Sequence, residues 1–158
     1  MERKPRGPHT AFLLAQVGAH AAAKFAERLS ALKLTPPDAG ILRMLGLSAG
    51  MSQQELSGKL NIHPSRLVAI LDELENRSLL ERKPHSEDRR QYSLHLTANG
   101  RDALADIGRI GREHQDALCT ALSPDEREQL AELLKKIADQ QGLTPGVHPG
   151  YSRLRAPR

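Results

Sequence analysis

The stretch that decides the fold is residues 52–100, SQQELSGKLNIHPSRLVAILDELENRSLLERKPHSEDRRQYSLHLTANG. Its first part predicts a short helix. Ser52 and Glu55 have the spacing of a capping box, in which the hydroxyl and the carboxylate each satisfy a free backbone N–H at the helix start. Leu56 and Leu60 are four residues apart and would share one buried face. The sequence therefore predicts a helix that begins after Ser52 and ends near Leu60.

A tight turn and a second helix follow. Asn61 tolerates the positive φ that such a turn requires, and Ile62 is expected to be the apolar plug between the two helices. His63 would cap the second helix, and Pro64 suits its first position, where a missing N–H costs nothing. This helix is expected to run to about Arg77. Its apolar stripe consists of Leu67, Ile70, Leu71 and Leu74.

The outward face of the second helix is slim over its first two turns, as a helix that enters a DNA major groove needs to be. It carries Ser65, Arg66, Val68 and Ala69. Arg66 can donate two hydrogen bonds to a guanine, and Val68 or Ala69 can contact a thymine methyl group. We therefore take these four residues as candidates for base contact. The alternative is that Arg66 is an ordinary solvated charge on a helix.

A charged β-hairpin is predicted after the second helix. Tyr92, Leu94 and Leu96 alternate with polar residues, which is typical of a half-buried strand. The preceding segment 85–90, HSEDRR, is polar and would form a basic tip. A helix-turn-helix followed by such a hairpin is a winged helix. The predicted fold class is therefore mainly α with a small β-hairpin wing (α+β).

The string EDRRxxxLxLTxxG, residues 87–100, resembles the wing signature of the MarR (multiple-antibiotic-resistance regulator) family. The resemblance implies that Asp88 braces the wing and that Arg90, with Arg89 beside it, enters the DNA minor groove. The physical reason is that a carboxylate can orient a flexible guanidinium, which a narrow minor groove then attracts. Without a helix-turn-helix before it, the same string would be read as an ordinary solvated charge cluster.

The resemblance spans residues 10–141 and has one departure. Many family members have a basic residue one helical turn after the Arg66 position, where this chain has Ala69, followed by Glu73. Base reading is therefore expected to be narrow and to depend on Ser65, Arg66 and the wing.

Long helices are predicted on both sides of the winged helix. Thr35, Thr97 and Ser123 are capping residues that mark helix starts, and an alanine-rich face predicts close packing of the first helix on another helix. The predicted organisation is a flexible basic arm (1–8), a helical dimerisation platform (9–34 and 98–141), a winged helix-turn-helix domain (35–97) and a Pro/Gly-rich basic tail (142–158).

Two features of the flanking regions leave alternatives open. Gly108 and Gly111 are costly inside a helix, so they are expected to mark a bend or a close helix crossing. The tail could pack across a partner subunit through Val147 and Tyr151, or it could be unstructured.

Composition narrows the class of protein. Aromatic residues make up 3% of the 158 residues and there is no Trp, so the core must be aliphatic, which favours helices. Lys and Arg exceed Asp and Glu by 23 to 19, and the basic residues gather in the N-terminus, the wing and the tail, which suits a polyanionic partner. The single Cys119 excludes an internal disulfide, and no signal peptide or long apolar run is visible. We expect a soluble, cytoplasmic protein that does not contact a membrane.

Residues suited to catalysis or metal binding do not converge. His114 and Cys119 are separated by five positions, about 140° around a helix, so they cannot share a metal ion. The chain contains no H-E-x-x-H, P-loop, G-x-S-x-G or C-x-x-C motif. We expect no enzyme activity, no metal and no cofactor.

The residues and the resemblance together predict a dimeric repressor of transcription. A two-fold homodimer would bind double-stranded DNA at a pseudo-palindromic operator. The resemblance also implies that a small molecule, often aromatic or phenolic, enters a cleft between the platform and the winged helix and releases the DNA. The residues that would bind it are not apparent from the sequence. Two alternatives are an architectural DNA-binding protein without an effector, and a helical interaction module whose wing grips another protein.

Overall fold

The structure is a computed structural model that describes residues 9–153; the arm expected at 1–8 and the chain end at 154–158 lie outside the described residues. The described part forms mainly helices with one small sheet, which confirms the predicted fold class. In chain order the elements are α1 (Thr10–Leu29), η1 (Ser30–Leu32), α2 (Pro36–Leu47), β1 (Met51–Ser52), α3 (Gln53–Leu60), α4 (Pro64–Asn76), β2 (Leu80–Pro84), β3 (Tyr92–Leu96), α5 (Ala98–Leu118), α6 (Pro124–Gln140) and η2 (Pro149–Arg153).

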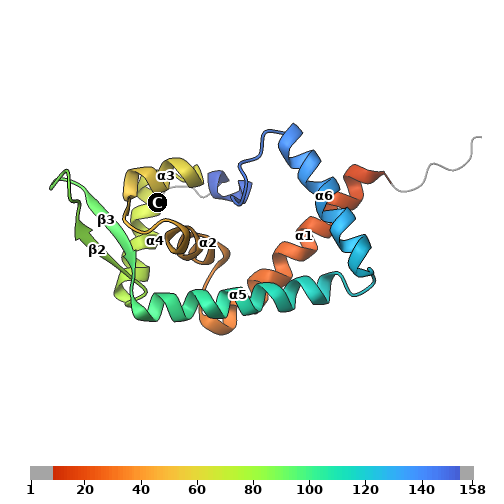
Figure 1. Ribbon diagram of the computed structural model, residues 1–158, viewed down its shortest axis with the longest axis horizontal. Helices are drawn as coiled ribbons and strands as arrows, with labels where there is room; N and C mark the ends of the chain where they lie inside the picture. The colour runs from red at the N-terminus through yellow and green to blue at the C-terminus, as the bar shows by residue number, and fades with distance from the viewer. Residues whose placement is uncertain (1–8, 154–158) are drawn as a thin grey trace, which may run out of the picture.

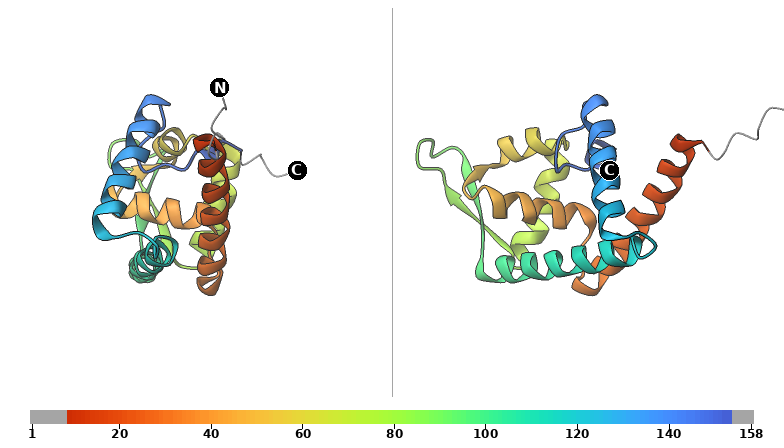
Figure 2. Two further views of the ribbon diagram at one scale, coloured as in Figure 1. Left: turned by 90° about the vertical axis from the view of Figure 1, so that its right-hand side faces the viewer. Right: turned by 45° about the vertical axis from the view of Figure 1, so that its right-hand side comes forward.

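The long helix α5 connects the two ends of the molecule (Figure 1). It starts beside the β-hairpin and runs along the bottom of the view to α1 and α6 at the right. Above its first half, α2, α3, α4 and the hairpin form a compact winged-helix unit, whereas α1 and α6 rise from its other end (Figure 2). Because α5 packs against both α1 and α2, it links the winged-helix unit to the outer helices.

The residues predicted to begin and end the helices of the helix-turn-helix have the expected conformations and hydrogen bonds. The Ser52 hydroxyl accepts a hydrogen bond from the Glu55 N–H (3.1 Å), and the Ser52 N–H donates to the Glu55 carboxylate (2.7 Å). Asn61 adopts a φ of 50°, and Ile62 is buried between the two helices. His63 caps α4, because its Nδ1 accepts from the Ser65 N–H at 3.3 Å. The predicted helix-turn-helix is therefore confirmed.

The sheet has three strands rather than the two that were expected. β2 and β3 form the antiparallel hairpin, from Leu80 opposite Leu96 to Pro84 opposite Tyr92. β1 pairs with the other edge of β3, with Met51 opposite Leu94, so the strand order is β1-β3-β2. Two residues are too few to show an alternating pattern, which is why the sequence did not predict β1.

Burial along β3 also differs from the predicted alternation. Leu94 is fully buried, but Tyr92 is 55% exposed. Tyr92 lies toward the tip of the hairpin, which projects beyond the helices (Figure 1). Ser93 is buried in its place, and its hydroxyl donates to the Lys83 carbonyl at 3.3 Å and contacts His95 Nε2 at 2.9 Å.

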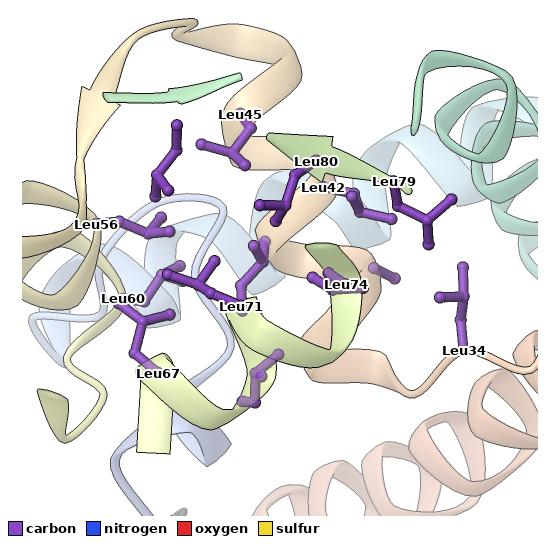
Figure 3. Packing of buried hydrophobic residues seen from close by; sticks show 14 of the residues in the cluster. Leu34, Leu42, Leu45, Leu56, Leu60, Leu67, Leu71, Leu74, Leu79 and Leu80 are labelled. Atoms are coloured by element: carbon purple, nitrogen blue, oxygen red, sulfur yellow. The ribbon is translucent and has the colours of Figure 1, made fainter. Parts of the chain in front are cut away.

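The hydrophobic core lies mainly inside the winged-helix unit (Figure 3) and extends to Leu29 of α1 and to Ile107 and Ile110 of α5. Leucines from α1, α2, α3, α4, β2 and β3 meet there, and the predicted stripe of α4 faces inward as a whole. The largest fully buried side chains include Leu42, Leu45, Leu56, Leu60, Leu67, Leu71, Leu74 and Leu80. Burying one such side chain contributes about 1.5–3 kcal/mol, so this cluster fixes how α4 is presented.

The two glycines of α5 do not mark a close crossing in this chain. A Cβ at Gly111 would meet nothing within 4 Å, and one at Gly108 would contact only Arg112, at 3.5 Å. α5 also continues through both positions. The glycine that a close approach does require is Gly100, where a side chain would collide with the backbone carbonyl of Leu79.

The tail is structured within the described residues, which contradicts the unstructured alternative, while packing across a partner subunit stays a prediction. It folds back onto α2 of its own chain, where Tyr151 is buried and its hydroxyl donates to the Pro37 carbonyl at 3.2 Å. Gly40 permits this docking, because any side chain there would collide with the Tyr151 hydroxyl. A contact between residues this far apart in sequence leaves no local signal.

Candidate nucleic-acid interface

The start of α4 is open to solvent and carries four of the candidate residues. Ser65, Val68 and Ala69 are exposed, and Arg66 is half-buried. The Arg66 Nε is buried and has no hydrogen-bond partner among the described residues.

Ser65 also helps to cap the helix. Its hydroxyl contacts His63 Nδ1 at 2.7 Å, while its backbone N–H donates to the same nitrogen. A hydroxyl has one donor and two acceptor positions, so after donating to His63 Nδ1 the Ser65 hydroxyl keeps both acceptor positions. Ser65 is therefore both part of the cap of α4 and one of the candidate contact residues.

An ion-pair network that the sequence did not reveal fixes α4 to the hairpin. Arg82 of β2 is 15% exposed at its side chain and pairs with Asp72 of α4, with 2.7 Å between Nη2 and Oδ1. The Arg82 guanidinium also pairs with Glu75 of α4, and the Arg82 backbone N–H donates to Glu75 Oε1 at 3.1 Å. Asp72 and Glu75 lie three residues apart on one helix face, but only the register of β2 brings Arg82 to them. Arg82 is therefore a positioning residue for α4.

The wing tip is ordered by Asp88. Its Oδ1 accepts a hydrogen bond from the Arg90 backbone N–H at 2.9 Å, and its Oδ2 accepts from the Gln91 side chain at 3.4 Å. The His85 N–H closes the loop by donating to the Gln91 carbonyl at 2.9 Å. The sequence argument expected the carboxylate to orient a guanidinium. Instead Asp88 holds the backbone, and no ion pair joins it to Arg89 or Arg90 in the described chain.

Arg90 and Pro64, the first residue of α4, border one groove, whereas the candidate residues Ser65, Arg66, Val68 and Ala69 are not among its lining residues. The side chains of Arg89 and Arg90 are exposed at the tip of the wing. The groove of about 480 Å³ between the wing and the first turns of α3 and α4 is lined by Arg90 and Pro64. Gln53, Gln54 and Tyr92 also line it, and none of these three was named as a site residue from the sequence. The two glutamines stand in the first turn of α3, so their place beside a helix-turn-helix could have identified them.

Neither a metal centre nor a membrane-spanning helix occurs in residues 9–153. No three His, Cys, Asp or Glu side chains in this range lie close enough to hold a metal ion. None of the helices there is long and apolar enough to cross a membrane.

A helix-turn-helix with an exposed second helix, followed by a hairpin with two arginines at its tip, defines a winged-helix DNA-binding protein. The sequence profile of the MarR family matches residues 34–92, which include α2, α3, α4 and most of the hairpin. The chain is also 35% identical over 113 residues to the putative transcriptional regulatory protein for the hcr operon of Thauera aromatica, a match that covers 71% of this chain and 68% of that protein. This chain belongs to the MarR family of transcriptional regulators.

Solved structures of related proteins extend the likeness to the outer helices. The transcriptional repressor CouR, bound to a 23-mer DNA duplex, has 30% sequence identity and a TM-score of 0.75, and the match covers 87% of this chain and 99% of CouR. The Mycobacterium tuberculosis MarR family protein Rv2887, in complex with DNA, has 26% identity and a TM-score of 0.72, and the match covers 82% of this chain and 98% of that protein. These relatives are named as transcriptional regulators or repressors.

Proposed function

We propose that this protein is a dimeric, sequence-specific repressor that binds a pseudo-palindromic double-stranded DNA operator and releases it when a small molecule binds. The observation that carries the proposal is that Arg90 of the wing and Pro64, the first residue of α4, line one groove, with Arg82 fixing α4 to the hairpin. Two relatives support DNA as the partner, because CouR and Rv2887 were each solved bound to DNA. The M. tuberculosis protein is also named a repressor.

Base reading is assigned to α4. Arg66 would donate to a guanine in the major groove, Ser65 would add one polar contact, and the small side chains of Val68 and Ala69 would let the helix approach the bases. The wing would reach the flanking minor groove through Arg90, with Arg89 beside it. Asp88 would keep the loop in shape without touching DNA.

Dimerisation is proposed from the apolar surface of the outer helices. No residue of α6 is buried, and its large apolar side chains Leu133 and Ile137 are 50% and 43% exposed. Phe12 of α1 is 61% exposed. Large apolar side chains gathered on exposed helices mark an interface. A two-fold dimer would place two copies of α4 about one DNA turn apart, roughly 34 Å, and so match a pseudo-palindrome.

An effector is proposed from a cavity between the outer helices and the winged-helix unit. Its volume is about 540 Å³, and its walls include Phe25 of α1, Gly40 of α2 and Ile107 of α5. Small-molecule sites have volumes of roughly 300–1,000 Å³, so a compact organic molecule fits.

Sedimentation and competition binding test the proposal. We expect the free protein to sediment as a dimer of the 17.4 kDa chain at micromolar concentration. A specific duplex should bind at least about a thousandfold more tightly than random duplex at the same salt concentration. A monomer would contradict the dimer, and equal affinity for both duplexes would point to the architectural alternative. Salt-insensitive capture of another protein without DNA affinity would point to the interaction module.

A further inference from the structure

The C-terminal strap, defined as residues 142–151, is a folded segment that returns from the end of α6. It leaves α6 through a turn at Gly142, where φ is 68° and the Leu143 N–H donates to the Ala138 carbonyl at 3.0 Å. From there the strap crosses toward α3 and α2 (Figure 1). The chain after α6 therefore turns back to the winged-helix unit.

Tyr151 anchors the strap in α2. The residue is 6% exposed and belongs to the hydrophobic core, and its hydroxyl donates to the Pro37 carbonyl at 3.2 Å. A Cβ at Gly40 would overlap with the Tyr151 hydroxyl and would lie 2.8 Å from Cζ, so the anchor requires glycine at position 40. An aromatic side chain buries about 150–250 Å² of its surface, which makes this a large contact for a chain end.

The strap also lies beside the helix-turn-helix. Val147 packs against the hydrophobic core, and with Leu143 and His148 it borders a crevice of about 160 Å³. Leu60 and Asn61 line the same crevice. Leu60 is the last residue of α3, and Asn61 is its left-handed cap, with a φ of 50°. The strap therefore borders the turn that leads into α4.

These contacts connect α6 to the winged-helix unit. α6 has no buried residue of its own, whereas the strap that follows it places Tyr151 in the core. α6 also carries part of the apolar surface from which the dimer is proposed. α5 joins the same two parts of the molecule through α1, α2 and β3. The strap adds a separate constraint at α2 and at the turn before α4.

We propose that the strap fixes the orientation of the winged-helix unit relative to α6, with Tyr151 as the positioning residue, and thereby sets the half-site spacing that the dimer accepts. The inference rests on the proposed function and adds a determinant of spacing. One extra base pair between half-sites moves them apart by about 3.4 Å and rotates them by about 35°. A dimer held by its straps cannot follow this change, whereas a dimer without them can adapt.

The first test measures the docking of Tyr151 without DNA. Tyr92→Phe leaves Tyr151 as the sole tyrosine in a chain without Trp, so tyrosine fluorescence in this background reports on the strap. Adding Gly40→Ala should expel the ring and raise the acrylamide quenching constant at least about twofold. Gly111→Ala is the matched control, because a Cβ there meets nothing within 4 Å, and it should leave quenching unchanged. Equal quenching in the two variants would overturn the anchor.

A double-mutant cycle tests the same contact from both sides. Gly40→Ala should lower the midpoint of urea unfolding in the parent protein, because the ring of Tyr151 must leave its place. In the Tyr151→Ala background the same substitution should leave the midpoint unchanged or raise it, since no ring is displaced and alanine favours a helix. An equal loss in both backgrounds would show that Gly40→Ala acts independently of the strap and would overturn the anchor.

The decisive test is the spacing preference of the full-length protein. Duplexes carry the selected half-sites at their preferred separation, or with one base pair added or removed at the centre, and anisotropy gives the affinities at fixed salt. We expect the parent protein to prefer the natural spacing at least about tenfold, and Tyr151→Ala and Gly40→Ala to prefer it less than about threefold. Tyr151→Phe keeps the ring and should retain the parent ratio. A loss of stability alone lowers the folded fraction, weakens all the duplexes equally and leaves the ratio unchanged.

The outcomes separate the strap from the proposed function. A folded, dimeric Tyr151→Ala variant that discriminates spacing as the parent does would overturn the strap proposal alone, and so would a parent protein that binds the selected half-sites equally well at every spacing. A parent protein that does not prefer the selected half-sites over random duplex would refute the proposed function and this inference with it.

Discussion

The carboxylate of Asp88 accepts a hydrogen bond from the backbone N–H of Arg90, with 2.9 Å between Oδ1 and N. This contact closes an Asx turn at the tip of the wing. The hydrogen bond fixes the Arg90 backbone and does not involve the Arg90 guanidinium, which could therefore enter a DNA groove. We therefore expect Asp88 to act on DNA binding through the shape of the loop, although its own charge would repel DNA.

Replacing Asp88 separates these two effects. Asp88→Ala should weaken DNA binding at fixed salt, because the loop loses its brace. Asp88→Asn is the matched control: it keeps the Oδ1 acceptor and removes the negative charge, so it should bind as tightly as the parent protein or more tightly. Fluorescence anisotropy with one duplex measures both. A gain in affinity for Asp88→Ala, with the fold intact, would refute the bracing role.

Removing the wing arginine should change the salt dependence of binding. Each subunit of a dimer would lose one charge contact in Arg90→Ala. The slope of log K against log salt should then fall by about 2, close to one counterion per contact. Lys136→Ala on α6, at the far end of the chain from the wing, is the charge-matched control and should leave the slope unchanged. An unaltered slope in Arg90→Ala would exclude this side chain from the interface.

Arg66 should contribute to specificity. We expect Arg66→Ala to cost about 1–3 kcal/mol of binding free energy and to relax the preference at one base position in each half-site. Binding to a panel of singly substituted duplexes measures the preference position by position. If every duplex weakens equally, Arg66 contacts only phosphate.

The Arg82 network should stabilise both the fold and the presentation of α4. Arg82→Gln leaves Asp72 and Glu75 without their cation, and because both carboxylates are substantially exposed the loss of unfolding free energy should be only about 1–2 kcal/mol. Lys83→Gln is the matched control for stability, since its pair with Glu81 is exposed on both sides and should contribute little. Urea unfolding gives the stability.

DNA affinity gives the second readout for Arg82. A positioning role requires Arg82→Gln to weaken specific binding under conditions where the variant is fully folded. Parent-like affinity in the folded variant would restrict Arg82 to stability.

The raised pKa of Tyr151 predicts that the free energy of unfolding decreases in alkaline solution. Burial raises its pKa to about 12, so the folded chain keeps a proton that an unfolded tyrosine loses from about pH 10. The stabilising effect is complete below pH 10 and is lost as pH rises through about 12, with a total of about 2–3 kcal/mol. Tyr151→Phe cannot titrate, so the difference in unfolding free energy between parent and variant should shrink over this window. A pH-independent difference would show that Tyr151 is not buried.

Local signals account for the parts of the fold that were predicted. The cap formed by Ser52 and Glu55, the positive φ of Asn61 and the inward stripe of α4 all depend on residues within a few positions of one another. The mainly helical fold class and the β-hairpin wing were both predicted from local patterns of this kind. Each is a short-range preference of the chain and needs no knowledge of the tertiary structure.

The contacts that the sequence could not reveal depend on how elements distant in the sequence align in the folded chain. Arg82 meets Asp72 and Glu75 only once β2 is aligned with α4, and Tyr151 meets Pro37 across 114 positions. The Asp88 brace was predicted, but its contact with the backbone depends on the φ and ψ angles of the tip. The candidate DNA residues were named from the sequence, and their contacts with bases stay predictions.

The most direct test of the function is selection of bound sequences from a random duplex library, followed by sequencing. We expect the full-length protein to enrich two inverted half-sites with centres about one helical turn, roughly 10 base pairs, apart. Arg66→Ala should lose enrichment at one position in each half-site and keep the spacing. Retention of bulk DNA without any enriched sequence, by a protein that is folded and dimeric, would contradict sequence-specific regulation.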